Sequence, residues 1–306
     1  YFSTAKRKFI IADTPGHEQY TRNMVTGASN CNLAVVLVDA RNGVITQTRR
    51  HSFIASLLGI KHIVVTINKM DLVDWSEARF EQIRQDYNDA VSRMGFADIH
   101  YIPVSALHGD NVVNPSGHMP WYQGSTLLNH LENVNIATDR NLIDLRFPVQ
   151  YVIRPDLHFR GFAGTVASGV IRVGDEVLCL PSSRKTRVKR LVAYGGDLQE
   201  AWPPMAVVVT LADEVDVSRG SMLVHPNNQP NSGTDCEAML VWMHETAATE
   251  GQTYLVKHTT NLVPATLAKV RYRVDVNTMR KSEADTLAMN EIGRVQISLH
   301  RPISYD

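Results

Sequence analysis

The sequence predicts an α/β domain followed by two all-β barrel domains. In the first part of the chain, short apolar runs alternate with segments of helical periodicity, as in sheets whose strands are joined by helices. After the first third to half of the chain, the apolar runs are short and are separated by turn residues, which is typical of β domains. Polar segments at 135–144 and 225–233 separate the three parts, so we expect domains at 1–138, 144–228 and 234–306.

Four apolar runs of the α/β domain are predicted to be parallel strands. They are nearly continuous rather than alternating, which is typical of strands that are covered on both faces. They lie at 8–13, 33–39, 62–68 and 100–104. The ligand of such a sheet lies at the carboxyl ends of its strands. Asp13, Asn68 and Ser105 lie at three of these ends.

Helices are expected between the strands, because apolar residues there recur at three- and four-residue spacing. These helices are predicted at 18–28, around Phe53 to Leu58, from Phe80 to Met94 and at 126–134. Asp74, followed three residues later by Glu77, suits a capped start for the third of them.

The β part is predicted from short runs rich in β-branched and aromatic residues. In the second domain they lie at 146–153, 176–180, 185–192 and 206–211, with a hairpin at 161–171. In the third domain they lie at 238–243, 253–258, 266–276 and 293–299.

Composition excludes several classes of protein. The 306 residues carry no formal net charge, with 31 basic and 31 acidic residues, whereas proteins that bind nucleic acid usually show a basic excess. We therefore expect no nucleic-acid partner. No run of about 18 apolar residues occurs, so we expect no membrane-spanning helix. Cys31, Cys179 and Cys236 lie far apart without metal-like spacing, which indicates reduced thiols of a cytoplasmic protein.

The residues Asp13-Thr14-Pro15-Gly16 follow the first predicted strand. An Asp here can hold a nucleotide-bound Mg²⁺ through a water molecule, and the Gly16 N–H can reach a γ-phosphate. Taken alone, the motif also fits a plain surface turn. His17 comes next, where polar residues orient the attacking water; the alternative is a surface histidine that caps the following helix.

The residues Asn68-Lys69-Met70-Asp71 form a more specific motif. The Asp71 carboxylate can accept hydrogen bonds from N1–H and the exocyclic amine of guanine, which adenine cannot match. Asn68 would fix the loop, and the Lys69 stem would cover the base. The alternative is a polar turn between a strand and a helix that ends in a cap.

Ser105 and Ala106 supply a third element, two backbone N–H groups for the guanine O6. The three elements in this order, each at a strand end of one sheet, predict a guanine-nucleotide site in a P-loop-type GTPase domain. The glycine-rich phosphate loop of such domains, with its Lys and Ser/Thr, does not occur in the sequence. We expect it before Tyr1, together with the first strand and the first switch segment, and we expect further strands of the third domain after Asp306.

Two other features have less specific interpretations. The basic cluster at 183–190 could contact an acidic partner or a phosphate backbone, but its interleaved Thr186, Val188 and Leu191 favour a solvated strand face. Trp121 and Tyr122 are expected to anchor a loop rather than to stack on a ligand.

Several stretches resemble a known family, the GTPase subunits (subunit 1, the large subunit) of bacterial sulfate adenylyltransferases. The resemblance is strongest at 9–24, 47–52 and 67–73, and it continues at 119–122, 238–243, 273–278 and 290–295. The parent class is the translation-factor GTPases, which share the Asp-x-x-Gly-His and Asn-Lys-x-Asp elements and two β-barrels.

The resemblance implies a GTPase that forms a heterodimer with a smaller adenylyltransferase subunit. That subunit joins sulfate to the AMP part of ATP, and GTP hydrolysis drives this uphill step of sulfate assimilation and cysteine biosynthesis. It further implies that Asp13 and Gly16 sense Mg²⁺ and the γ-phosphate, and that His17 positions water. GTP would be held through its base by Asn68, Lys69, Asp71, Ser105 and Ala106.

Two other functions are compatible with the motifs. A translation elongation factor that delivers aminoacyl-tRNA would need a tRNA-binding face on the second domain, which the neutral composition does not support. A nucleotide-free scaffold that only holds the partner subunit is the third hypothesis, because the phosphate loop does not occur in the sequence.

Overall fold

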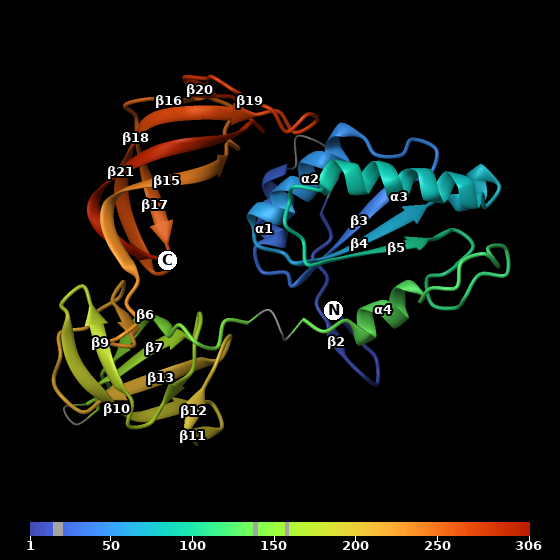
Figure 1. The fold of residues 1–306 in the computed structure, drawn as a ribbon. Coiled ribbons are helices and arrows are strands. Elements are labelled where there is room, and N and C mark those ends of the chain that lie inside the picture. Colours follow the sequence, from blue (N-terminus) through green and yellow to red (C-terminus); the bar gives the residue numbers. More distant parts are fainter. Residues whose placement is uncertain (15–20, 137–139, 157–158) are drawn as a thin grey trace. The chain divides into compact units, whose positions relative to one another are not determined.

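The computed structural model describes residues 1–14, 21–136, 140–156 and 159–306. Contacts within the chain divide it into two compact units, each described separately below (Figure 1). The first unit comprises Tyr1–Thr138, Met239–Ala248 and Arg271–Arg294, and the second comprises Asp139–Ala238, Thr249–Val270 and Val295–Asp306. The domain limits expected from the sequence stay a prediction.

A parallel sheet of three strands forms the centre of the first unit (Figure 1). Its order is β3 (Leu33–Asp39), β4 (His62–Asn68) and β5 (Asp98–Pro103). The middle strand β4 is buried along nearly its whole length, as its continuous apolar run predicts. Asp39 lies opposite Asn68, so the carboxyl ends of β3 and β4 are level.

Helices cover both faces of this sheet (Figure 1). They are α1 (Thr21–Ala28), α2 (Thr46–Leu57), α3 (Glu77–Val91) and α4 (Leu127–Asn133), with a short 3₁₀ helix η2 (Met70–Val73) after β4. Apolar residues of α1, α2 and α3 share one core with Ile63 and Val65 of β4. Leu127 of α4 packs with Val64 and Ile102 on the opposite face, because successive strand residues point to opposite sides.

Residues 8–13 do not form a strand of the parallel sheet, so this prediction is wrong. Of these residues, only Lys8–Phe9 form a strand, β2, which pairs antiparallel with β1 (Phe2–Ser3), where Phe2 and Phe9 stack at 4.6 Å. Ile10 and Ile11 are 83% and 63% exposed. The local pairing takes up the backbone groups of β2, and β3 remains the edge strand of the sheet.

The predicted cap of α3 is also wrong by two residues. Ser76 is the N-cap, and its side chain accepts a hydrogen bond from the Arg79 N–H at 3.2 Å. Asp74 and Trp75 both have positive φ, 54° and 48°, whereas an N-cap residue needs an extended backbone. Asp74 instead ends η2 and turns the chain toward α3.

A closed antiparallel barrel forms the first part of the second unit. Its strands are β6 (Arg146–Ile153), β7 (Gly161–Thr165), β9 (Glu176–Leu180), β10 (Arg184–Ala193), β13 (Ala206–Leu211) and β14 (Met222–Val224). They pair in the order β10-β13-β7-β6-β14-β9, and β9 pairs back with β10 to close the ring. Short strands β8 (Ile171–Arg172), β11 (Gly196–Leu198) and β12 (Glu200–Ala201) complete this part.

The hairpin predicted at 161–171 does not form. Strand β7 pairs with β6 and β13, whereas β8 pairs with β12. Barrel closure decides this outcome, because β7 finds a partner on each side from the ring and none of its backbone is left for β8.

The strands after residue 230 belong to both units. They are β15 (Asn231–Val241), β16 (Ala248–Thr249), β17 (Thr253–His258), β18 (Asn261–Val274), β19 (Lys281–Ser282), β20 (Thr286–Leu287) and β21 (Ile292–Tyr305). A sheet runs in the order β15-β21-β18-β17, with β19 added beside β18. Within the first unit, Val274 and Ile292 are buried in the same core as the helices.

Candidate functional site

Two loops meet beyond the carboxyl ends of β4 and β5. They are the loop at 68–71 and the loop at 105–106, two of the three predicted motifs. The Val104 N–H donates to the Ile67 oxygen at 2.8 Å, and the Met70 N–H donates to the Val104 oxygen at 3.2 Å. Met70 is fully buried, so its side chain anchors the first loop in the core. The backbone thus places the two motifs side by side.

The Asn68 side chain joins these loops directly. Its Oδ1 accepts hydrogen bonds from the Lys69 N–H at 2.7 Å and from the Ala106 N–H at 3.0 Å. Lys69 has φ 64°, a left-handed conformation that is uncommon outside glycine and that this bond helps to hold. These two bonds hold the loop, and the assignment of Asn68 to a guanine site stays a prediction.

The Asp71 carboxylate is oriented by Ser105. The Ser105 Oγ donates to Asp71 Oδ1 at 2.7 Å, and Ser105 is fully buried while Asp71 is half-buried. A hydrogen bond to a charged acceptor is stronger than a neutral one. Sequence reasoning missed this function, because it gave Ser105 only a backbone contribution.

The two backbone N–H groups predicted for guanine O6 have protein acceptors in this structure. The Ser105 N–H donates to the Asp110 oxygen at 3.3 Å, and the Ala106 N–H donates to Asn68. The first bond closes the turn from Ser105 to Asp110, in which Gly109 has a φ of +79°. The Ala106 N–H is thus held by a side chain and the Ser105 N–H by the backbone.

Asp39, at the end of β3, contacts the first loop and was not predicted. Its Oδ2 accepts a hydrogen bond from Lys69 Nζ at 2.9 Å. The same carboxylate accepts three hydrogen bonds from Arg41, from its backbone N–H at 2.9 Å, its Nε at 3.0 Å and its Nη2 at 2.6 Å. Arg41 and Lys69 hold the pKa of Asp39 well below its usual range, because both stabilise the charged form.

A cluster of aromatic and polar side chains supports the second loop. Asp110 is buried and accepts hydrogen bonds from Ser116 Oγ at 2.7 Å and from Trp75 Nε1 at 3.3 Å, and His118 Nδ1 lies 3.2 Å from its Oδ1. The Trp75 and His118 rings stack at 4.5 Å. Burial alone would raise the pKa of Asp110, but these hydrogen bonds hold it below its usual value. The cluster fixes the turn that carries Ser105.

Trp121 anchors this cluster to the core, as the sequence predicts. Its Nε1 donates to the Trp75 oxygen at 3.0 Å, and its ring packs against Phe80 at 5.3 Å. Tyr122 donates its hydroxyl to the Tyr101 oxygen at 3.2 Å.

The predicted phosphate side of the site is only partly described. Asp13 is exposed and forms no hydrogen bond with another described residue, whereas Gly16 and His17 lie outside the described residues. In the parts that the structure describes, no group of three or more His, Cys, Asp and Glu side chains is placed to hold a metal ion. Over the same ranges, no helix is long and apolar enough to cross a membrane.

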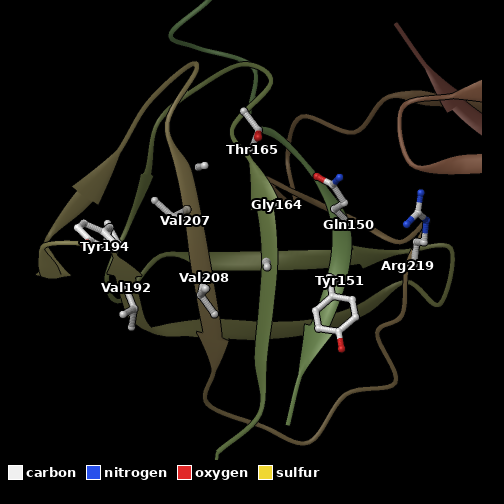
Figure 2. A pocket seen from close by; sticks show the side chains of 12 residues that line it. Gln150, Tyr151, Gly164, Thr165, Val192, Tyr194, Val207, Val208 and Arg219 are labelled. Atoms are coloured by element: carbon white, nitrogen blue, oxygen red, sulfur yellow. The ribbon is translucent and has the colours of Figure 1, made fainter. Parts of the chain in front are cut away.

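A separate hollow of about 570 Å³ lies on the barrel of the second unit. Figure 2 shows its lining on neighbouring strands, with Gln150 and Tyr151 on β6, Gly164 and Thr165 on β7, and Val208 on β13. Its lining contains none of the predicted site residues.

The basic cluster lies on β10 and is paired with acidic neighbours. Lys185 and Arg187 reach Glu176 at 3.4 and 3.7 Å, and Arg190 reaches Asp197 at 2.9 Å. These contacts fit the solvated strand face that the sequence favours.

Comparison with known families decides the class of the α/β domain. The profile of the elongation factor Tu GTP binding domain matches residues 1–153, half of the chain. The chain belongs to this family. A second profile, the GTP-eEF1A C-terminal domain-like family, matches residues 235–306. Together they confirm the predicted fold class, a P-loop-type GTPase domain followed by β-barrel domains.

Similar proteins have names that are more specific than the name of the family. The chain is 60% identical to a bifunctional enzyme CysN/CysC of Rhodopirellula baltica, over 100% of the chain and 48% of that protein. It is 56% identical to sulfate adenylyltransferase subunit 1 of Teredinibacter turnerae and also to that of Bacteroides fragilis, covering 65% and 64% of those proteins. These relatives confirm the resemblance seen in the sequence. The chain spans about half to two thirds of their length.

Solved structures of sup35 are similar in fold. The complex with GMPPNP has a TM-score of 0.50 and 26% identity, and the complex with GDP has a TM-score of 0.52 and 25% identity. Each match covers 92% of this chain and 73% of the other.

Proposed function

We propose that this chain is the GTP-hydrolysing part of a sulfate adenylyltransferase. In this function GTP hydrolysis drives the formation of adenosine 5′-phosphosulfate and pyrophosphate from ATP and sulfate. The observation that carries the nucleotide part is the meeting of two loops, through the Asn68–Ala106 and Ser105–Asp71 hydrogen bonds. The names of the relatives support the sulfate part.

The geometry favours guanine as the base. Asp71 Oδ1 is occupied by the Ser105 hydroxyl, but a carboxylate has about four acceptor positions. The remaining positions are sufficient for the N1–H and the exocyclic amine of guanine. Adenine presents an acceptor at N1, so it would meet the Asp71 charge without a proton to share. Binding of GMPPNP and GDP by sup35 supports the same nucleotide class.

The phosphate side of the proposal rests on the sequence. Asp13 would hold Mg²⁺ through water, Gly16 would contact the γ-phosphate and His17 would orient the attacking water. Bound Mg²⁺ supplies charge neutralisation at the phosphates. The exposed position of Asp13 fits a carboxylate that acts through water rather than as one member of a protein metal cage.

The proposed partner is a smaller adenylyltransferase subunit that holds ATP and sulfate. For GTP to drive that reaction, this chain must present different contacts to the partner in its GTP and GDP states, because a ligand shifts an equilibrium only through differential affinity. The segment after Gly16 is the proposed switch. The three cysteines are free thiols, which fits the cytoplasm that the sequence predicts.

The test is a coupled assay on the protein expressed from its complete reading frame together with its candidate partner. GTP hydrolysis and adenosine phosphosulfate formation are measured with and without sulfate and ATP. We expect GTP turnover to rise when both are present and product formation to stop without GTP.

A His17→Ala variant tests the proposed role of His17 in hydrolysis. It should hydrolyse GTP more slowly while its affinity for GDP stays near that of the wild type. If GTP turnover ignores sulfate and ATP but rises with ribosomes, the protein is a translation factor and the proposal is wrong. If neither GTP nor GDP binds, the chain is a scaffold.

A further inference from the structure

We propose that Asp39 is a positioning residue for guanine-nucleotide binding, which acts by holding the Lys69 side chain beside the base site. The inference rests on the proposed function, because it assigns Asp39 to the same guanine site. It adds an element that none of the three sequence motifs contains.

Asp39 lies at the carboxyl end of β3. Parallel pairing of β3 with β4 sets Asp39 opposite Asn68, so the Asp39 carboxylate lies beside the start of the loop at 68–71. The Ala40 N–H donates to the Asn68 oxygen at 2.8 Å, which fixes this register at the strand end. From there, Asp39 Oδ2 reaches Lys69 Nζ at 2.9 Å.

The Asp39 carboxylate is held in place independently of Lys69. Arg41 donates to both of its oxygens, so the Asp39 side chain has little rotational freedom. The turn that carries Arg41 is itself tied to α3, because Arg79 donates to the Ala40 oxygen at 2.7 Å and to the Arg41 oxygen at 3.1 Å. Asp39 is therefore a fixed anion and not a mobile surface charge.

Lys69 needs a fixed anion such as Asp39 to keep its side chain ordered. The Lys69 side chain is 45% exposed, and a lysine that becomes ordered loses much of its rotamer entropy. Asp39 is only 20% exposed and removes part of this loss before a nucleotide arrives. The stem of Lys69 is then already oriented where the proposed function needs it to cover the base.

The experiment measures the affinity for GDP of the protein expressed from its complete reading frame. Asp39→Asn keeps the shape of the side chain and removes its charge. We expect GDP to bind about three- to tenfold more weakly, as for the loss of a partly screened, charge-assisted hydrogen bond. Asp197→Asn is the matched control, because it removes the charge from a similar Asp–Arg pair on the barrel, and it should leave GDP affinity unchanged.

A double-mutant cycle tests whether Asp39 acts through Lys69. In a Lys69→Met background, Asp39→Asn should have no further effect on GDP affinity. Equal effects of Asp39→Asn with and without Lys69 would overturn the inference, because Asp39 would then act on the fold in general.

Salt provides a second readout that does not depend on the Lys69 variant. We compare the GDP affinity of the wild type with that of Asp39→Asn while the salt concentration rises from about 0.05 M to about 1 M. The ratio of the two affinities should approach one, because salt screens the attraction between Asp39 and Lys69. A ratio that salt does not change would make Asp39 structural and overturn the inference. If the wild type binds GDP and Asp39→Asn binds it equally well, only this inference fails; if the wild type binds no GDP, the proposed function fails with it.

Discussion

Replacing Ser105 by Ala should weaken guanine binding without unfolding the protein. The change removes one hydroxyl, whose Oγ donates to Asp71 Oδ1 at 2.7 Å. A hydrogen bond to a charged group contributes about 1.5–3 kcal/mol. Asp71 is half-buried, so water can partly replace the lost donor, and we take the lower end of this range. About 1.5 kcal/mol corresponds to roughly tenfold weaker binding.

The assay is calorimetric titration with GDP and with IDP, whose base lacks the exocyclic amine. If Ser105 orients Asp71, Ser105→Ala should lower the preference for GDP over IDP, because the Asp71 contact with that amine depends on the orientation of the carboxylate. Ser105→Thr keeps the hydroxyl and should retain most of the preference. The melting temperature is measured for each variant as a check on the fold.

Two results would refute this reasoning. The first is a Ser105→Ala variant that binds GDP as well as the wild type does. The second is an equal loss of GDP and IDP affinity together with a lower melting temperature, which would show that Ser105 acts only through the fold of the 105–110 turn.

Three further predictions concern other parts of the first unit. Asp71→Asn should bind GDP about 10- to 100-fold more weakly and gain affinity for xanthosine diphosphate, because the amide replaces an acceptor by a donor. Calorimetric titration with both nucleotides measures this change. An unchanged preference for GDP would show that Asp71 does not contact the base. The rings of His100 and His130 stack at 4.1 Å, and burial lowers the pKa of both side chains. The unfolded chain therefore binds more protons than the folded chain at low pH. The free energy of unfolding should fall as the pH drops through about 6.5. Urea titrations at several pH values should show that this fall in the free energy of unfolding is shallower for His130→Gln than for the wild type. Equal slopes for the two proteins would contradict the assignment. Ser52 Oγ donates to the Thr48 oxygen at 2.8 Å, so the Tyr87 hydroxyl, 2.7 Å away in the core, is the donor to Ser52 Oγ. Ser52→Ala removes this acceptor and should lower the free energy of unfolding by about 1–3 kcal/mol. Adding Tyr87→Phe to this variant should restore part of the loss, and a further decrease would contradict this reasoning.

The elements around the base site could be predicted from the sequence for a simple physical reason. Strands buried on both faces give continuous apolar runs, and the first polar residues after such runs lie at the carboxyl edge of the sheet. Asn68 ends β4, Ser105 lies two residues after β5, and the structure joins the two loops at these strand ends. Helix α4 begins after Thr126, whose capping bond is a local feature, so its start at Leu127 lies within one residue of the predicted one.

The parts that could not be predicted depend on partners far away in the sequence. The Asp39–Lys69 contact needs the register of β3 against β4, which no local pattern specifies. The run at 8–13 has the composition of a buried strand, but a strand exists only where neighbours accept its hydrogen bonds, and the structure pairs only Lys8–Phe9 of it. The cap at Ser76 depended on the left-handed backbone of Asp74, which the sequence does not indicate.

The hydrogen bonds of the base loops indicate where selectivity for guanine would arise. The Ala106 N–H already donates to Asn68 Oδ1, so a guanine O6 that took this donor would exchange one acceptor for another. Exchanges of this kind change the free energy little, because the number of hydrogen bonds stays the same. The bonds from the base to the Asp71 carboxylate would instead be added to the one that Ser105 makes, and they would involve a charge. Discrimination against other bases would therefore reside mainly at Asp71, whereas Asn68 and Ala106 would hold the loops at the distance that lets the base enter.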